Sequence, residues 1–168
     1  MDLQTTIIGL SISALCVYAF VLLTRSRKKK EKKLINQLRA VALEQACQIT
    51  EHELGFDFSL GIDNINQYIF YTKENQAGFD NQVIDLKTVR KCEVVSPKKR
   101  VAKEEYIDRI TLVFHPLISG AREEKIVLFD SDATALPNGE PLMAKRWAEK
   151  VNALLKDRKA STAFRVAV

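Results

Sequence analysis

The amino-acid sequence predicts an α+β protein in which N-terminal helices precede a small antiparallel β domain that a C-terminal amphipathic helix closes. Three observations support this fold class. The chain opens with a long uncharged apolar stretch, its middle alternates apolar and polar residues as strands do, and its last third returns to helical spacing. A chain of 168 residues has room for about one such domain beside its N-terminal helices.

Residues 1–24 are expected to form a transmembrane anchor. From Leu3 to Thr24 the chain carries no charge over 22 residues, and about 20 apolar residues in a helix cross a bilayer core of about 30 Å. A cleaved secretion signal would have positive charge before the apolar stretch and a small-residue cleavage site after it, whereas here only Asp2 precedes it and "TRSRKKK" follows. A buried core helix is the alternative, but the length of the stretch and its abrupt basic end favour the anchor.

A dense basic run follows the apolar stretch and is expected to contact the membrane surface. Lys and Arg beside a membrane are attracted to anionic head groups and stay on the cytoplasmic side. We therefore expect a single-pass protein of the inner (plasma) membrane, with its N terminus outside and its C-terminal domain in the cytoplasm. A role in topology alone, without recognition of a particular lipid, is the simpler interpretation. The run consists of Arg25, Arg27, Lys28, Lys29, Lys30, Lys32 and Lys33.

The positive charge of the chain comes from this run and does not indicate nucleic-acid binding. The chain has 26 basic and 21 acidic residues, of which the segment 25–33 holds seven and one, so that 19 and 20 remain for everything else. A nucleic-acid module spreads positive charge over a folded face, with aromatic residues among it. We therefore expect the partners to be the lipid bilayer and a protein, and no nucleic acid.

Residues 25–54 are expected to form the basic stop and a juxtamembrane helix. The sequence "EKKLINQLRAVALEQACQITEHEL" has no Gly or Pro and predicts a helix from about Lys29 to Thr50, which can continue the anchor. Its apolar stripe must pack on its own domain, on a second copy or on another protein, and its own domain is the commonest case. The stripe consists of Leu34, Ile35, Leu38, Val41, Ala42, Ala46 and Ile49.

Residues 55–157 are expected to form the β domain and its closing helix. In "FDFSLGID", apolar and polar residues alternate from Phe56 to Asp63, and this pattern predicts a half-buried strand. Pro141 suits the first turn of a helix, and Trp147 lies on the apolar stripe of that helix while Asn152 lies on the polar side. Residues 158–168 are expected to be a flexible tail. The further strands are expected in "QYIFYTK", "QVIDLKTVRKCEVVS", "YIDRITLVFH" and "KIVLFD", with "PKKRVAKEE" as a charged turn.

The segments "GIDNINQYIFY", "VIDLKTVRKCEVV" and "AKRWAEKVNALL" carry a resemblance to a known family. A first strand that ends in Asp, a tyrosine-rich returning strand and a closing helix resemble the bacterial membrane-anchored pleckstrin-homology-like proteins over roughly Phe56–Lys156. The resemblance implies a bent antiparallel sheet or small β-barrel that the final helix closes at one corner. Members that bind phosphoinositides have a basic cluster in the loop between the first two strands, whereas that loop here is "DNIN".

A second basic cluster lies instead in the later segment "PKKRVAKEE". We consider it a secondary patch that could touch lipid, although a solvated charged turn is the simpler interpretation. The cluster consists of Lys98, Lys99, Arg100 and Lys103.

No motif in the sequence indicates catalysis, a cofactor or a metal site. GxGxxG, Walker and GxSxG motifs are absent, and the three cysteines form no CxxC pair. The two histidines, His52 and His115, have no Cys or Ser at the spacing of a triad or of metal ligands. Aspartates such as Asp63 and Asp130 are more simply turn formers whose carboxylates accept backbone N–H groups. We therefore expect no enzyme activity, no cofactor, no metal and no small-molecule substrate.

The expected function is that of a non-enzymatic interaction or scaffold module, which offers a strand edge or a groove to a protein partner. Two alternatives stay open. One is a lipid-binding or sensing domain at a membrane surface, which would use the segment 98–103 together with the basic run. The other is an enzyme whose site the sequence does not reveal.

Overall fold

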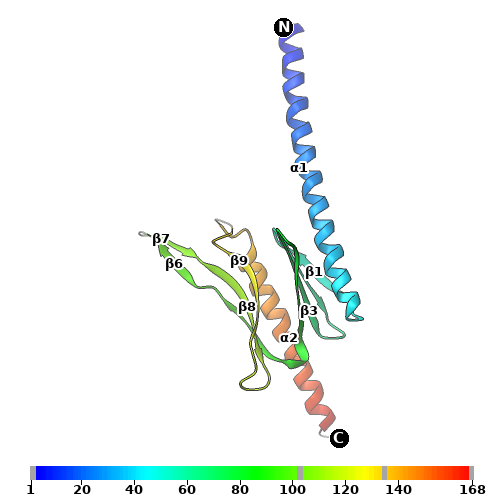
Figure 1. Cartoon of the computed structure of the whole chain (residues 1–168), viewed down its shortest axis with the longest axis vertical. Helices are drawn as coiled ribbons and strands as arrows, with labels where there is room; N and C mark the ends of the chain where they lie inside the picture. Colours follow the sequence, from blue (N-terminus) through cyan, green and yellow to red (C-terminus); the bar gives the residue numbers. More distant parts are fainter. Residues whose placement is uncertain (1–2, 102–103, 134–135, 167–168) are drawn as a thin grey trace.

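A long N-terminal helix leads into a body of antiparallel sheets with a second helix between them (Figure 1). The computed structural model describes residues 3–101, 104–133 and 136–166. The elements in chain order are α1 (Leu3–Glu44), β1 (Glu51–Leu54), β2 (Phe58–Asp63), β3 (Tyr68–Asn75), β4 (Gly78–Asp85), the short 3₁₀-helix η1 (Leu86–Thr88), β5 (Val89–Val95), β6 (Lys98–Val101), β7 (Glu104–Ile107), β8 (Arg109–Pro116), β9 (Glu124–Asp130) and α2 (Glu140–Val166).

The strands form two separate sheets and one hairpin. The first sheet has the order β1-β2-β3-β4, the second has the order β5-β8-β9, and β6 pairs with β7 alone. All of these pairs are antiparallel, so the α+β class with antiparallel pairing is confirmed. The closed barrel is wrong, because η1 redirects the chain between β4 and β5 and, among the described residues, no strand of the first sheet pairs with the second.

Helix α1 is continuous over 42 residues, from the apolar stretch into the folded body. Within the part of the chain that the structure describes, no helix is sufficiently long and apolar to cross a membrane. The side chains of residues 3–12, of Ala19 and of Leu23, and residues 1–2 altogether, lie outside what is described. The finding overturns the expected transmembrane anchor, together with the single-pass topology and the inner-membrane location that depended on it.

The C-terminal half of α1 packs on the outer face of the first sheet, as its stripe predicts. This contact confirms that Leu34, Leu38, Val41 and Ala42 of the stripe are buried on the protein's own domain, whereas Ala46 is exposed beyond the end of the helix. The buried cluster consists of Leu38, Val41, Ala42, Cys47 and Phe70, with Ile49, Tyr68 and Val83 packed against it.

Strand β2 is buried on both faces, so the prediction of a half-buried strand is wrong. Its polar or small residues face α1, which the alternation of the sequence alone does not show. The Ser59 hydroxyl donates to the Leu34 carbonyl oxygen at 3.3 Å. A methyl group on Gly61 would meet Leu38 Cδ2 at 2.9 Å and Ile49 Cγ2 at 3.1 Å, so glycine is what lets the helix lie this close to the strand.

Helix α1 ends at Glu44, earlier than the predicted Thr50. Ala46 has a positive φ of 54°, its N–H donates to the Leu43 carbonyl, and the Cys47 N–H donates to the Ala42 carbonyl. These are the two hydrogen bonds of a Schellman motif, in which a left-handed residue terminates a helix. The chain then turns back, and the segment 51–54, which has helical composition, pairs with β2 as strand β1.

Replacing Ala46 by glycine is expected to raise the free energy of unfolding by about 1 kcal/mol, because glycine adopts a left-handed conformation without the steric cost of Cβ. Urea denaturation measures the change. Ala40→Gly is the matched control, since Ala40 is exposed inside the same helix and glycine there should cost about 1 kcal/mol. A loss of stability in Ala46→Gly similar to that of the control would contradict the assignment of the helix end.

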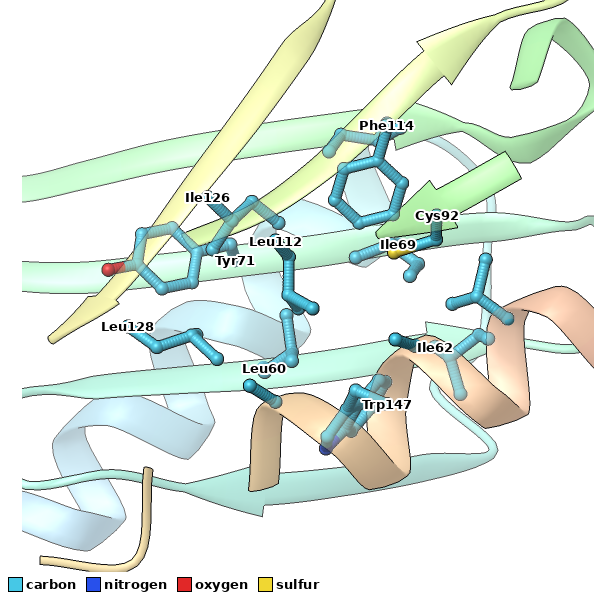
Figure 2. Packing of buried hydrophobic residues seen from close by; sticks show 14 of the residues in the cluster. Leu60, Ile62, Ile69, Tyr71, Cys92, Leu112, Phe114, Ile126, Leu128 and Trp147 are labelled. Atoms are coloured by element: carbon cyan, nitrogen blue, oxygen red, sulfur yellow. The ribbon is translucent and has the colours of Figure 1, made fainter. Parts of the chain in front are cut away.

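The main core lies between the two sheets and α2 (Figure 2). Its aromatic side chains include Phe58, Phe114 and Trp147, each fully or almost fully buried. The Tyr71 hydroxyl, which lies at the edge of this core, donates to the Val127 carbonyl oxygen at 2.7 Å and thereby links β3 to β9. Val127 adjoins the irregularity at which the β8–β9 register shifts by one residue, and such bulges free a backbone group for another partner.

Helix α2 buries the stripe predicted for it. Asn152, however, is not simply a solvent-facing residue: its side-chain amide donates to the Cys92 carbonyl at 2.7 Å and its oxygen accepts from the Cys92 N–H at 2.9 Å. Arg158 donates to the carbonyls of Leu86 and Val89 at 2.6 and 3.0 Å. The helix continues to Val166, so most of the expected flexible tail is helical. The buried stripe consists of Met143, Ala144, Trp147, Ala148, Val151 and Leu155.

Candidate functional site

The structure divides the predicted basic run between two environments. Lys33 Nζ lies 2.8 Å from Glu74 Oε1, and Lys30 Nζ lies 4.0 Å from the other oxygen of that carboxylate. The same two ammonium groups lie 4.8 and 4.9 Å from the ring centroids of Phe56 and Phe79. The hydrogen bond from Lys33 lowers the pKa of Glu74. Lys30 and Lys33 therefore hold α1 against the body.

The other five basic residues of the run are exposed to solvent. Among the described residues, none of the five makes an ion pair, so their charges remain available to a ligand. They are Arg25, Arg27, Lys28, Lys29 and Lys32.

The second basic cluster lies on a β-hairpin, not in the expected turn. Lys98 and Arg100 belong to β6, and both contact Glu105 on β7, at 3.4 and 3.0 Å. Lys99 is exposed on the same strand. Lys103, the fourth member of the predicted cluster, lies outside the described residues. The hairpin therefore brings Lys98 and Arg100 together at the Glu105 carboxylate, while Lys99 lies on the opposite face of β6.

The groups with potential for chemistry lie in surface ion networks or in the core. His115 lies between Glu123 and Glu93, with nitrogen–oxygen distances of 2.9 and 3.4 Å. Burial raises the pKa of the Cys92 thiol to about 12 and also raises that of Cys47, and a protonated thiol is a poor nucleophile. Within residues 3–101, 104–133 and 136–166, no group of three His, Cys, Asp or Glu side chains could hold a metal ion.

A groove lies where the two sheets fail to meet. Strand β4 pairs only with β3, and strand β9 pairs only with β8, so each is the edge of its sheet. These two edges face a cavity of about 630 Å³. We call this cavity the edge groove, and its lining consists of Gln82, Val83, Arg122, Glu123, Glu124 and Lys125.

The free edge of β4 presents backbone groups at every second residue. A two-residue turn joins the paired Asn75 and Gly78, and in such a hairpin the residues next to the turn are bonded to each other. Hydrogen-bonded and non-bonded pairs then alternate along the strands. The N–H and C=O groups of Asn81 and Val83 therefore point away from β3, while those of Asp80 and Gln82 bond to it.

The four sheet edges differ in how they are protected. Helix α2 covers the edge of β5, where the Asn152 amide bonds to the backbone of Cys92. The same helix flanks β1, because Arg146 and Trp147 contact Glu53 and Lys150 contacts Glu51. Natural edges are protected by cover, Lys, Pro or bulges. Strand β9 has Lys125 and an irregularity in its register. Strand β4, with the sequence GFDNQVID, has no Lys, Pro or bulge over eight residues, and its charged side chains are Asp80 and Asp85.

The charges around the edge groove are mixed. Arg122 and Lys125 lie on the β9 side, where Lys125 Nζ is 3.6 Å from Glu123. Burial raises the pKa of Glu124, and the negative charge of Asp85 at the end of β4 raises it further. The groove thus offers both a cation and a carboxylate beside a row of backbone donors and acceptors.

When the chain is compared with known proteins, no family model, no curated protein and no solved structure matches it. The resemblance to pleckstrin-homology-like proteins and the bacterial origin therefore stay predictions. Sequence reasoning anticipated a strand edge in general terms and did not locate it, because the groove depends on which strands end each sheet.

Proposed function

We propose that this protein is a non-enzymatic interaction module, which binds an extended segment of a partner protein by strand addition to β4. The observation that carries the proposal is the eight-residue edge of β4, which has no paired strand on that side and no Lys, Pro or bulge, beside the edge groove. In strand addition, backbone hydrogen bonds supply the affinity, and pockets for alternate side chains supply the specificity.

The arrangement of β4 fits this mode of binding on both faces. Gln82 lines the edge groove, so alternate side chains of an added strand would enter the space between the sheets. Asn81 belongs to the opposite face, where its side-chain oxygen accepts from the Thr72 hydroxyl at 3.0 Å. The added strand would extend the first sheet to five strands and narrow the gap towards β9.

Amide hydrogen exchange tests the proposal at single residues. A photo-crosslinking amino acid at Asn81 of the full chain identifies the contacting segment, and a synthetic peptide of that segment is then titrated against the unmodified protein. We expect the exchange of the Asn81 and Val83 amides to slow at least about tenfold, because they gain partners. The amides of Asp80 and Gln82, which already bond to β3, should change much less.

Two variants of one residue provide the control. Asn81→Pro removes an N–H that faces the free edge, and edge strands tolerate proline at such a position. Asn81→Ala keeps that N–H, and both variants remove the side-chain contact with Thr72. We expect the proline variant to lose at least about tenfold in peptide affinity relative to the alanine variant, with both folded by circular dichroism. Equal affinities, or a bound peptide that leaves both outward amides unprotected, would refute strand addition at β4.

A further inference from the structure

Two basic patches that are far apart in the sequence lie at the same end of the molecule. Figure 1 shows that the N-terminal half of α1 and the β6–β7 hairpin leave the body at one end, while the C-terminal part of α2 lies at the opposite end. We call this the basic end. Its exposed cations are Arg25, Arg27, Lys28, Lys29 and Lys32 on α1, and Lys98, Lys99 and Arg100 on β6.

The acidic residues on these two segments do not neutralise the cations. Glu31 is the one acid in the segment 25–33, β7 carries Glu104 and Glu105, and Glu105 is shared by Lys98 and Arg100. Glu74, on β3, pairs with Lys30 and Lys33, which are not counted among the cations of the basic end. The basic end therefore carries a surplus of positive charge on two separate elements.

We infer that the basic end binds anionic lipid head groups at a membrane surface. Lys and Arg near a membrane surface are attracted to its anionic lipids, and both α1 and the hairpin carry exposed Lys and Arg side chains. The chemistry of α1 favours lipid over a nucleic acid, because exposed apolar side chains adjoin the cations. Leu15, Tyr18 and Phe20 are 68, 64 and 72 % exposed, and lipid covers such groups while a phosphate backbone leaves them in water. The inference concerns a surface contact and requires no helix that crosses the bilayer.

Vesicle co-sedimentation of the full chain tests the inference. The probes are vesicles of phosphatidylcholine alone and vesicles in which about a third of the lipid is phosphatidylglycerol. We expect at least about tenfold tighter binding to the anionic vesicles at low salt, and this preference should shrink as sodium chloride is raised and screens the charges. Because apolar contacts contribute to both vesicles, the ratio of the two affinities isolates the charge term.

Matched variants separate the basic end from charge in general. Replacing Lys98, Lys99 and Arg100 by glutamine should reduce the anionic preference at least about tenfold. The control replaces Lys87, Arg90 and Lys156 by glutamine, which removes the same charge from η1, the start of β5 and the C-terminal part of α2. We expect the control to keep most of the preference.

Three outcomes would overturn the inference. They are equal binding to the two kinds of vesicle, equal losses in the two triple variants, and tighter binding to a duplex DNA of matched phosphate concentration than to the anionic vesicles. The test does not involve the β4 edge, so its result is independent of the proposed strand addition.

Discussion

Replacing Trp147 by alanine is expected to lower the free energy of unfolding by about 4 kcal/mol, the range found for large aromatic side chains removed from a core. Trp147 is 2 % exposed and packs between the two sheets from α2. Its indole Nε1 also donates to Glu53 Oε2 on β1, at 2.8 Å. The loss would therefore combine a cavity with an interrupted link between α2 and the first sheet. Urea denaturation measures it.

Two further substitutions separate these contributions. Trp147→Phe keeps most of the packing and removes the N–H, so it should cost much less than Trp147→Ala, about 1–2 kcal/mol. Leu142 lies on the same helix but is 65 % exposed, and Leu142→Ala should stay within about 0.5 kcal/mol of the parent. Equal effects of Trp147→Ala and Leu142→Ala would contradict the placement of α2.

Replacing Asp63 by alanine is expected to cost about 3 kcal/mol, because the buried carboxylate satisfies donors from two segments and their loss is expensive. Asp63 is 1 % exposed. Its oxygens accept from the backbone N–H groups of Gln48, Ile65 and Asn66, each at 2.9 Å, and from the Asn66 side chain at 2.8 Å. The carboxylate thus fixes the chain after α1 to the turn after β2.

The contribution of Asp63 should depend on pH in a defined direction. Burial raises the pKa of the carboxyl, but the hydrogen bonds from Asn66, Gln48 and Ile65 outweigh burial and lower the pKa below its usual value. A lowered pKa in the folded state means that the stabilisation is complete above the unfolded pKa of about 3.9 and is lost as the pH falls through the folded value. The stability difference between the parent and Asp63→Ala should therefore be constant above about pH 5 and shrink below about pH 4.

Asp57 provides the control for both measurements. It is partly exposed and pairs with Lys73 at 3.4 Å, an arrangement that typically contributes less than about 1 kcal/mol. Asp57→Ala should therefore cost little at any pH. A pH dependence of Asp57→Ala as steep as that of Asp63→Ala would contradict the special role of the buried carboxylate.

Periodicity predicts the helical faces of this protein well. Leu34, Leu38 and Val41 repeat with helical spacing and are buried against the first sheet. Trp147 and Val151 of α2 also repeat with helical spacing and are buried in the main core. The role of Asp63 as a turn former is also confirmed, because a carboxylate after a strand has backbone donors within reach whatever the rest of the fold does. These predictions succeed because they depend on local geometry.

Other features depend on contacts that no local pattern contains. The segment with Glu51 and Glu53 has helical composition, yet it forms β1, and the partner of Glu53 is Trp147, 94 residues later in the chain. The end of α1 was missed because alanine, a good helix former, adopts a left-handed conformation at Ala46. The edge groove was not located because its walls are backbone edges of strands that are not consecutive in the sequence.

The uninterrupted course of α1 has a mechanical consequence. No proline interrupts the helix, and the segment from Leu3 to Lys30, where its contacts with the body begin, is about 40 Å long at 1.5 Å per residue. Leu38 packs so closely on Gly61 that the helix has no space to shift against β2. A force on the first turns of α1 would therefore be transmitted along the helix to β2. The first sheet would then rotate together with α1, because the helix has no flexible point at which it could bend independently of the sheet.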